Sequence, residues 1–105
     1  MKITFLGTGS SLGVPIIGCK CNVCKSNDSR DKRMRASVLI EVENKNIVID
    51  AGPDFRSQML LFNPAARLDA ILITHSHRDH IAGLDDIRPF NFLQNKDIPL
   101  FANKE

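Results

Sequence analysis

All three histidines of the 105-residue chain lie in one six-residue segment that begins at His75 and ends at His80. Imidazole nitrogens and carboxylate oxygens are ligands that borderline divalent metals such as Zn²⁺ and Mn²⁺ accept. Because His75 and His77 are two residues apart, an extended backbone places them on the same side. Asp79 and His80 supply a second, adjacent pair. The segment therefore predicts a metal site rather than a polar loop that is rich in histidine by chance.

Cys19, Cys21 and Cys24 form a second cluster, with C-x-C-x2-C spacing. Three cysteines cannot all pair in disulfides, and cytoplasmic proteins rarely keep disulfides. The spacing lets three thiolates converge on one tetrahedral zinc ion, which takes four ligands when it is structural. Buried thiols and reactive thiols are the alternatives, and the flanking Lys20 and Lys25 fit burial poorly. The cluster therefore predicts a structural zinc.

The elements that would position these groups are strands that alternate with helices, which points to a layered α/β domain. Alternating or apolar runs predict strands at residues 2–6, 37–43, 47–50, 70–74 and 97–101, with a polar hairpin turn at 43–46. The apolar run at 70–74 is typical of a strand covered on both faces. One helix is expected from Pro53 to the Asn63-Pro64 pair, and another at 81–87; residues 16–35 show no regular period.

Length and composition limit the class of protein. A chain of this length forms one domain, and its 43% hydrophobic and 25% charged content is ordinary for a soluble globular protein. The net charge of +2 is too small to argue for nucleic acid or membrane binding. No apolar run approaches the ~20 residues of a membrane span, and the first apolar stretch is too short for a signal peptide. The expected location is cytoplasmic.

The histidine motif, which follows an apolar strand, and the upstream I-V-I-D-A-G motif that contains Asp50 resemble the signatures of the metallo-β-lactamase-fold hydrolases. The resemblance implies an αββα sandwich of the α/β (α+β) class with a mixed sheet and two divalent metal ions, Mn or Zn. His75 and His77 would bind the first metal, and Asp79 and His80 the second. Asp50 would orient a ligand, cap the turn that follows it, or do both.

A narrower resemblance covers residues 2–90. The glycine-rich loop at residues 7–15, followed by the cysteine motif, resembles the cyclic-phosphate phosphodiesterases of the carbon–phosphorus lyase (phosphonate) pathway. The resemblance implies a structural zinc held by the cysteines and one distant histidine, and the opening of 5-phosphoribosyl 1,2-cyclic phosphate by two manganese ions. The expected function is therefore a metal-dependent phosphodiesterase that uses a hydroxide bridging two metals, with Asp79 as its catalytic carboxylate.

Two alternatives keep the fold and change the function. The tRNA 3′-processing endonucleases begin with a similar strand and loop, but they are not known for such a cysteine cluster, and a net charge of +2 leaves no electrostatic footprint. A non-hydrolytic, zinc-stabilised protein similar to the pyrroloquinoline-quinone pathway member is the second. Its relatives tend to lose the first histidines of the loop motif, whereas His75 and His77 are both present here.

The expected partner is a small phosphorylated substrate, with neither membrane nor nucleic acid expected and a homodimer left open. Arg33 and Arg35 belong to a basic run that could contact the substrate phosphate. A charge run is more often a solvated loop. The two readings stay open.

The predicted ligand sets are incomplete. The superfamily's site normally draws two further histidines and a bridging aspartate, and the zinc needs a fourth ligand, but the chain has no other histidine. Asp85, Asp86 and Asp97 remain, and the first two are expected on a helix surface. Residues 1–105 are therefore expected to be the N-terminal portion of a single metallo-β-lactamase-like domain, truncated and inactive alone. A second layer of strands would be needed to cover the apolar strand faces.

Overall fold

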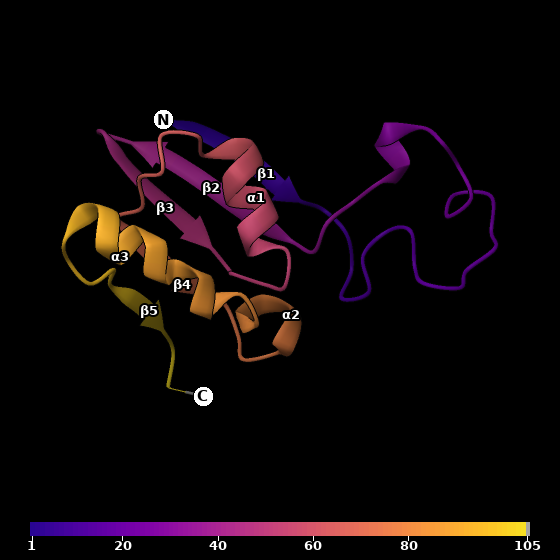
Figure 1. Cartoon of the computed structure of the whole chain (residues 1–105). Coiled ribbons are helices and arrows are strands. Elements are labelled where there is room, and N and C mark those ends of the chain that lie inside the picture. Colours follow the sequence, from indigo (N-terminus) through magenta and orange to yellow (C-terminus); the bar gives the residue numbers. More distant parts are fainter. Residues whose placement is uncertain (105) are drawn as a thin grey trace.

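The computed structural model describes residues 1–104, which form one five-stranded sheet with helices packed on one of its faces (Figure 1). The first three strands pair antiparallel and the last three parallel, so the sheet is mixed. This arrangement confirms the predicted α/β class. In spatial order the strands are β1 (Lys2–Gly7), β2 (Ser37–Val42), β3 (Lys45–Ile49), β4 (Ala70–Ile73) and β5 (Leu100–Ala102).

The predicted hairpin joins β2 to β3 through a tighter turn than the polar run suggested. Val42 pairs with Lys45, so Glu43 and Asn44 alone make the turn. Both have positive φ angles, 50° and 62°. That backbone matches the right-handed twist of the flanking strands, which is why two-residue hairpins adopt it.

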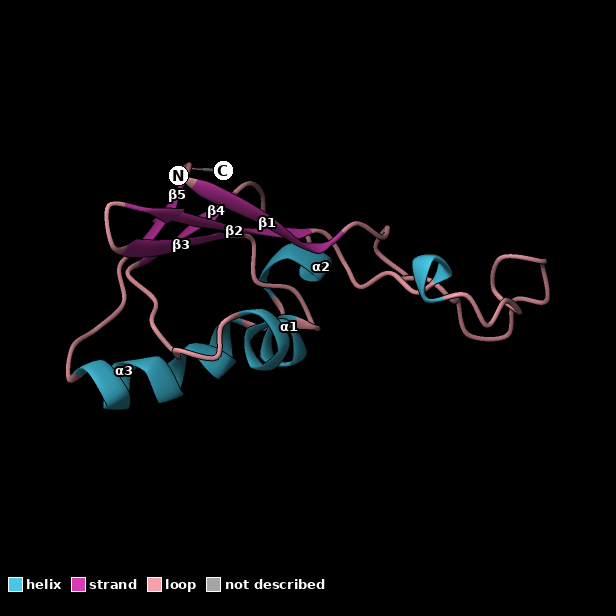
Figure 2. Cartoon of the chain, turned by 90° about the horizontal axis from the view of Figure 1, so that it is seen from above, coloured by secondary structure: helices cyan, strands magenta, loops and turns pink. Residues whose placement is uncertain are grey.

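Within residues 1–104, three α-helices accompany the sheet: α1 (Phe55–Phe62), α2 (Arg78–Ile81) and α3 (Arg88–Gln94). Seen from above in Figure 2, α1 and α3 lie below the same face of the sheet. The predicted helix after Pro53 is confirmed as α1, which ends before Asn63.

The predicted helix at residues 81–87 is confirmed only in part, because it is divided between two elements. α2 ends at Ile81, the chain bends at Gly83, and a 3-10 turn at Leu84–Ile87 leads into α3, which the sequence analysis did not predict. The absence of a side chain at Gly83 permits a close approach there, because a Cβ would lie 2.1 Å from the carbonyl oxygen of Gly52. Pro89 in the first turn of α3 was an overlooked start signal.

The hydrophobic core lies between the sheet and the helices. Leu39, Val48 and Ile71 are in register on adjacent strands and are all at most 1% exposed. From the helices, Phe55 and Phe90 pack edge to face with ring centroids 6.3 Å apart. The core includes Ile71 of β4, the strand that precedes the histidine loop.

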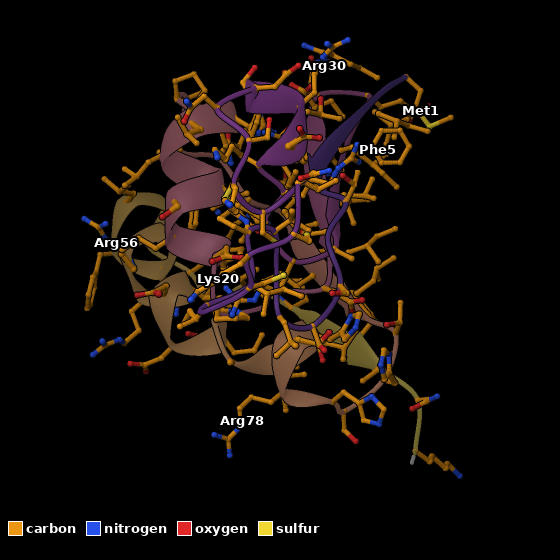
Figure 3. The ribbon with its side chains drawn as sticks, turned by 90° about the vertical axis from the view of Figure 1, so that its right-hand side faces the viewer. Met1, Phe5, Lys20, Arg30, Arg56 and Arg78 are labelled. Atoms are coloured by element: carbon orange, nitrogen blue, oxygen red, sulfur yellow. The ribbon has the colours of Figure 1, made fainter. Side chains whose placement is uncertain are left out.

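The opposite face of the sheet is apolar and open in residues 1–104. Ile3, Phe5 and Leu72 are 54%, 68% and 37% exposed, and Figure 3 shows Phe5 on the side of the molecule away from Arg56 of α1. The prediction that residues 70–74 form a strand covered on both faces is therefore wrong for the described chain. Ile71 is fully buried, but its neighbour Leu72 points to the open face, because side chains alternate along a strand.

Residues 15–32, here called the arm, extend away from the sheet (Figures 1 and 2). The arm begins and ends at a pair of backbone hydrogen bonds between Val14 and Arg33, with N–O distances of 2.9 and 2.8 Å. Apart from a 3-10 turn at Ser29–Asp31 it is irregular, as predicted. None of the helices in residues 1–104 has the length and apolar character that a membrane span requires.

Candidate metal centre

The histidine loop follows β4, directly beside the loop that follows β3. These two strands are parallel neighbours, so their carboxyl ends meet at one edge of the sheet. Asp50 is the first residue after β3, and its N–H donates to the carbonyl of Leu72 in β4 at 2.8 Å. Parallel pairing thus brings Asp50 beside Thr74 and His75, although about 25 residues separate them in the sequence.

The Asp50 side chain is 7% exposed and its carboxylate accepts three hydrogen bonds. Oδ1 accepts from the Thr74 N–H at 2.8 Å, and Oδ2 accepts from the Thr74 hydroxyl at 2.6 Å. Oδ2 also lies 2.6 Å from Nδ1 of His80. Asp50 therefore anchors the His80 ring by its Nδ1 edge and ties it to the end of β4.

Backbone contacts join the two loops as well. The Ala51 N–H donates to the His80 carbonyl at 2.9 Å, and the Gly83 N–H donates to the Ala51 carbonyl at 2.8 Å. Gly52 approaches so closely that a Cβ there would lie 2.0 Å from the Asp79 carbonyl oxygen. The glycines therefore allow the α2 segment to pack directly on the loop after β3.

The structure brings the predicted histidines together. The His75 ring centroid lies 4.5 Å from that of His77 and 4.0 Å from that of His80. Ligand atoms of Asp50, His75 and His80 all lie within 4.8 Å of one another. His77 is exposed at the residue that precedes α2. How these residues divide between a first and a second metal stays a prediction.

The donor set fits a cation. Nε2 of His80 and Oδ2 of Asp79 are 3.1 Å apart. With its Nδ1 hydrogen directed at Asp50, a neutral His80 presents a lone pair at Nε2, so two acceptors face each other at that distance. Such a pair requires a proton or a metal ion beside it. Imidazole and carboxylate together suit zinc, manganese or iron.

The three cysteines converge in the arm, where the Sγ atoms of Cys19, Cys21 and Cys24 lie within 4.8 Å of one another. The Cys24 N–H, which donates to Sγ of Cys21 at 3.4 Å, and the neighbouring thiols lower the pKa of Cys21 to about 7. All three cysteines are free thiols in the structure. The cluster offers three of the four ligands that a structural zinc needs.

Arg33 and Arg35 line a surface hollow of about 460 Å³ next to the glycine-rich loop. The Arg35 guanidinium lies 3.2 Å from the Asp54 carboxylate, so its charge is already paired. Arg33 donates to the Thr8 hydroxyl at 2.9 Å and is more exposed. Asp85 forms a surface ion pair with Arg88 at 3.0 Å, as expected for a residue outside the metal centre.

Thr74 is the residue of this site that sequence reasoning missed. It was placed only as the last residue of a strand, yet its N–H and hydroxyl both donate to Asp50, and its hydroxyl oxygen lies 2.9 Å from Nδ1 of His75. A hydroxyl residue directly before the first histidine was the available signal. Its partner on β3 could not be identified without the strand pairing.

Residues 45–105 match the family described as "Beta-lactamase superfamily domain". The chain therefore belongs to the β-lactamase superfamily, and it has the metallo-β-lactamase fold. A solved structure described as a new diphosphatase from the PhnP family is 48% identical, with a TM-score of 0.91, and the alignment covers 97% of this chain and 41% of that one. The predicted resemblance to metallo-β-lactamase-fold hydrolases is confirmed.

Two further proteins are similar. Octanoyltransferase from Porphyromonas gingivalis is 53% identical over 89 residues, which cover 84% of this chain and 18% of that protein. Zn²⁺-bound PqqB from Methylobacterium extorquens has a TM-score of 0.78 at 23% identity and aligns with 97% of this chain and 37% of its own, which shows a shared fold. The chain thus spans less than half the length of each of the three proteins.

Proposed function

We propose that the protein is a metal-dependent hydrolase that acts as a phosphodiesterase on a small cyclic phosphate, such as phosphoribosyl 1,2-cyclic phosphate. The observation that carries the proposal is the convergence of Asp50, His75 and His80 at one edge of the sheet. This site lies in a chain that is 48% identical to a diphosphatase of the PhnP family. The chain spans 41% of that relative, so the proposal concerns the whole protein.

In this proposal His75, His77, Asp79 and His80 hold two divalent ions, Mn or Zn. Divalent ions bound there lower the pKa of water and stabilise charge on the attacked phosphate. Asp50 holds the His80 ring so that Nε2 faces the ions, and it receives the Nδ1 hydrogen at 2.6 Å. A structural zinc binds to the three cysteines of the arm.

The proposed substrate is small and anionic. Arg33 is the more exposed of the two arginines at the hollow, so it is the better candidate for a phosphate contact. Arg35 links the segment that follows the arm to the start of α1, since it is paired with Asp54 just before that helix. A homodimer remains open, and the cytoplasm remains the expected location.

The test is hydrolysis of an aryl phosphodiester and of a ribose 1,2-cyclic phosphate by the full-length protein with added Mn²⁺. We expect turnover that disappears with a chelator and falls to background in His77→Ala. Ser76→Ala, an exposed neighbour in the same loop, is the matched control and should keep the wild-type rate. Wild-type activity that does not exceed that of His77→Ala on either substrate would contradict the proposal.

A second candidate is hydrolysis of a diphosphate, because the 48% identical relative is described as a diphosphatase. Release of phosphate from a small organic diphosphate, measured under the same conditions, distinguishes diphosphatase from phosphodiesterase activity. The octanoyltransferase match covers 18% of that protein, so its name does not identify the chemistry of the matched segment. Against the non-hydrolytic alternative, His75 and His77 are both present and their rings are 4.5 Å apart.

A further inference from the structure

Thr74 occupies the junction between the strand that positions the site and the histidines that would bind metal. It is the first residue after β4 and directly precedes His75. Its N–H is engaged by Oδ1 of Asp50 at 2.8 Å, which fixes the residue's backbone. Its hydroxyl lies between two groups, 2.6 Å from Oδ2 of Asp50 and 2.9 Å from Nδ1 of His75.

A count of hydrogens decides which atom donates in each contact. A threonine hydroxyl has one hydrogen and can accept through its lone pairs, whereas an ionised carboxylate can only accept. The Thr74 hydrogen must therefore go to Asp50, since two acceptors would otherwise face each other at 2.6 Å. The hydroxyl oxygen is left as an acceptor toward His75, so Nδ1 of His75 must carry the hydrogen.

The same carboxylate also determines which nitrogen of the His80 ring carries the hydrogen. Oδ2 of Asp50 accepts from Nδ1 of His80 as well as from Thr74, so Nδ1 of His80 is also protonated. In a neutral imidazole with its hydrogen on Nδ1, the lone pair is on Nε2. One aspartate and one hydroxyl thus leave the lone pairs of His75 and His80 on Nε2, in rings whose centroids are 4.0 Å apart.

We propose that Thr74 is a positioning residue that relays the Asp50 carboxylate to His75 and fixes that histidine in its Nδ1-protonated, Nε2-ligating form. Asp50 acts on His80 directly and on His75 only through this hydroxyl. Through its three hydrogen bonds, Asp50 supports the rings of both histidines. The inference deepens the proposed function, since it rests on these histidines being metal ligands.

The isosteric pair Thr74→Val and Thr74→Ser tests the relay. Valine keeps the branched shape and the N–H contact to Asp50 but removes the hydroxyl, whereas serine keeps the hydroxyl. In the metal-free, full-length protein with ¹⁵N-labelled histidine, long-range ¹H–¹⁵N correlation reports which ring nitrogen carries the hydrogen. The His75 signals are assigned by their loss in His75→Gln. Metal affinity is measured separately by competition with a chromophoric chelator for Zn²⁺.

In the wild-type protein we expect the hydrogen of His75 on Nδ1. Thr74→Val should release the ring to a mixture of tautomers and weaken Zn²⁺ binding by roughly 10–100-fold, the usual cost of losing an outer partner of a ligating histidine. Thr74→Ser should restore both. His80 is the internal control, because its Nδ1 contact to Asp50 remains in every variant.

Two results would overturn the relay: a wild-type His75 with its hydrogen on Nε2, or a Thr74→Val protein with unchanged tautomer and affinity. If Thr74→Val does not fold, the wild-type and Thr74→Ser spectra still show which nitrogen of His75 carries the hydrogen. Neither readout involves a substrate. A protein with the expected tautomer but no phosphodiesterase activity would contradict the proposed function and leave the relay intact.

Discussion

At the scale of single residues, the backbone conformation and hydrogen bonds at position 50 explain why an aspartate follows β3. Its φ of 64° lies in the left-handed region, where Asp and Asn are far more common than other non-glycine residues. Its buried carboxylate accepts from three donors, which an apolar side chain would leave without a partner. The backbone and the hydrogen bonds thus select the same residue type.

The cysteine cluster leads to a prediction at this scale. Cys21→Ser should remove most of the zinc that remains bound after dialysis. Losing a thiolate ligand should cost more than the roughly 10–100-fold that loss of an outer hydrogen-bond partner costs. Lys20→Ala, which lies between two of the cysteines, is the matched control and should keep its zinc. The measurement is elemental analysis of each purified protein, and equal zinc in both variants would argue against a site on these thiols.

At the scale of elements, the metal centre depends on two loops that pack backbone to backbone. Hydrogen bonds of Ala51 to His80 and of Gly83 to Ala51 hold α2 against the loop after β3. Because the contact involves main-chain atoms, its geometry depends on the absence of side chains at Gly52 and Gly83. The histidines are therefore placed by the packing of the loops as well as by their spacing.

Gly83→Ala tests this packing. The new Cβ would lie 2.1 Å from the Gly52 carbonyl oxygen and 2.6 Å from Cβ of Phe55, so we expect a loss of about 1–3 kcal/mol or more in unfolding free energy, as for other overpacked sites. The measurement is urea denaturation of the full-length protein. Zn²⁺ affinity should fall as well, because Asp79 and His80 must shift.

Gly18→Ala is the control for the general cost of a Cβ. Gly18 has a φ of +80° but no atom within 4 Å of the added Cβ, so only the left-handed strain of about 1–2 kcal/mol applies, and it falls in the arm. Equal losses in stability and metal affinity for the two variants would refute the packing explanation.

At the scale of the whole molecule, the sheet has one covered and one open face (Figure 2). The open face carries apolar side chains from adjacent strands, with Phe5 of β1 paired in register with Val38 of β2. An apolar surface of this kind usually marks an interaction site. We expect a second layer of the working protein to cover it.

Phe5→Asp tests this expectation in the full-length protein. If Phe5 is covered there, placing an unpaired carboxylate against apolar neighbours should cost about 3–5 kcal/mol in unfolding free energy. Ile17→Asp is the control, because Ile17 in the arm is fully exposed and should tolerate the charge. Denaturation curves that show no larger loss for Phe5→Asp than for Ile17→Asp would mean that the face stays open.

The sequence by itself determined the local features. Alternation and apolar runs located the five strands of residues 1–104, although β3 begins at Lys45 instead of residue 47 and β5 at Leu100 instead of residue 97. Two-residue spacing predicted that His75 and His77 would lie together, because the strand period is a property of neighbouring residues. The thiol cluster was equally local, since the three cysteines lie within six residues of each other.

Only the tertiary structure decided which distant residues meet. The parallel pairing of β3 with β4 brought Asp50 to Thr74 and His80. The loops that contain Gly52 and Gly83 meet where the predicted helix at 81–87 is interrupted. These contacts depend on strand order and loop packing, which no local pattern specifies. The orientation of the His80 ring follows from those contacts, because its partner Asp50 comes from another strand. His75 depends on them indirectly, since its partner Thr74 is itself held by Asp50.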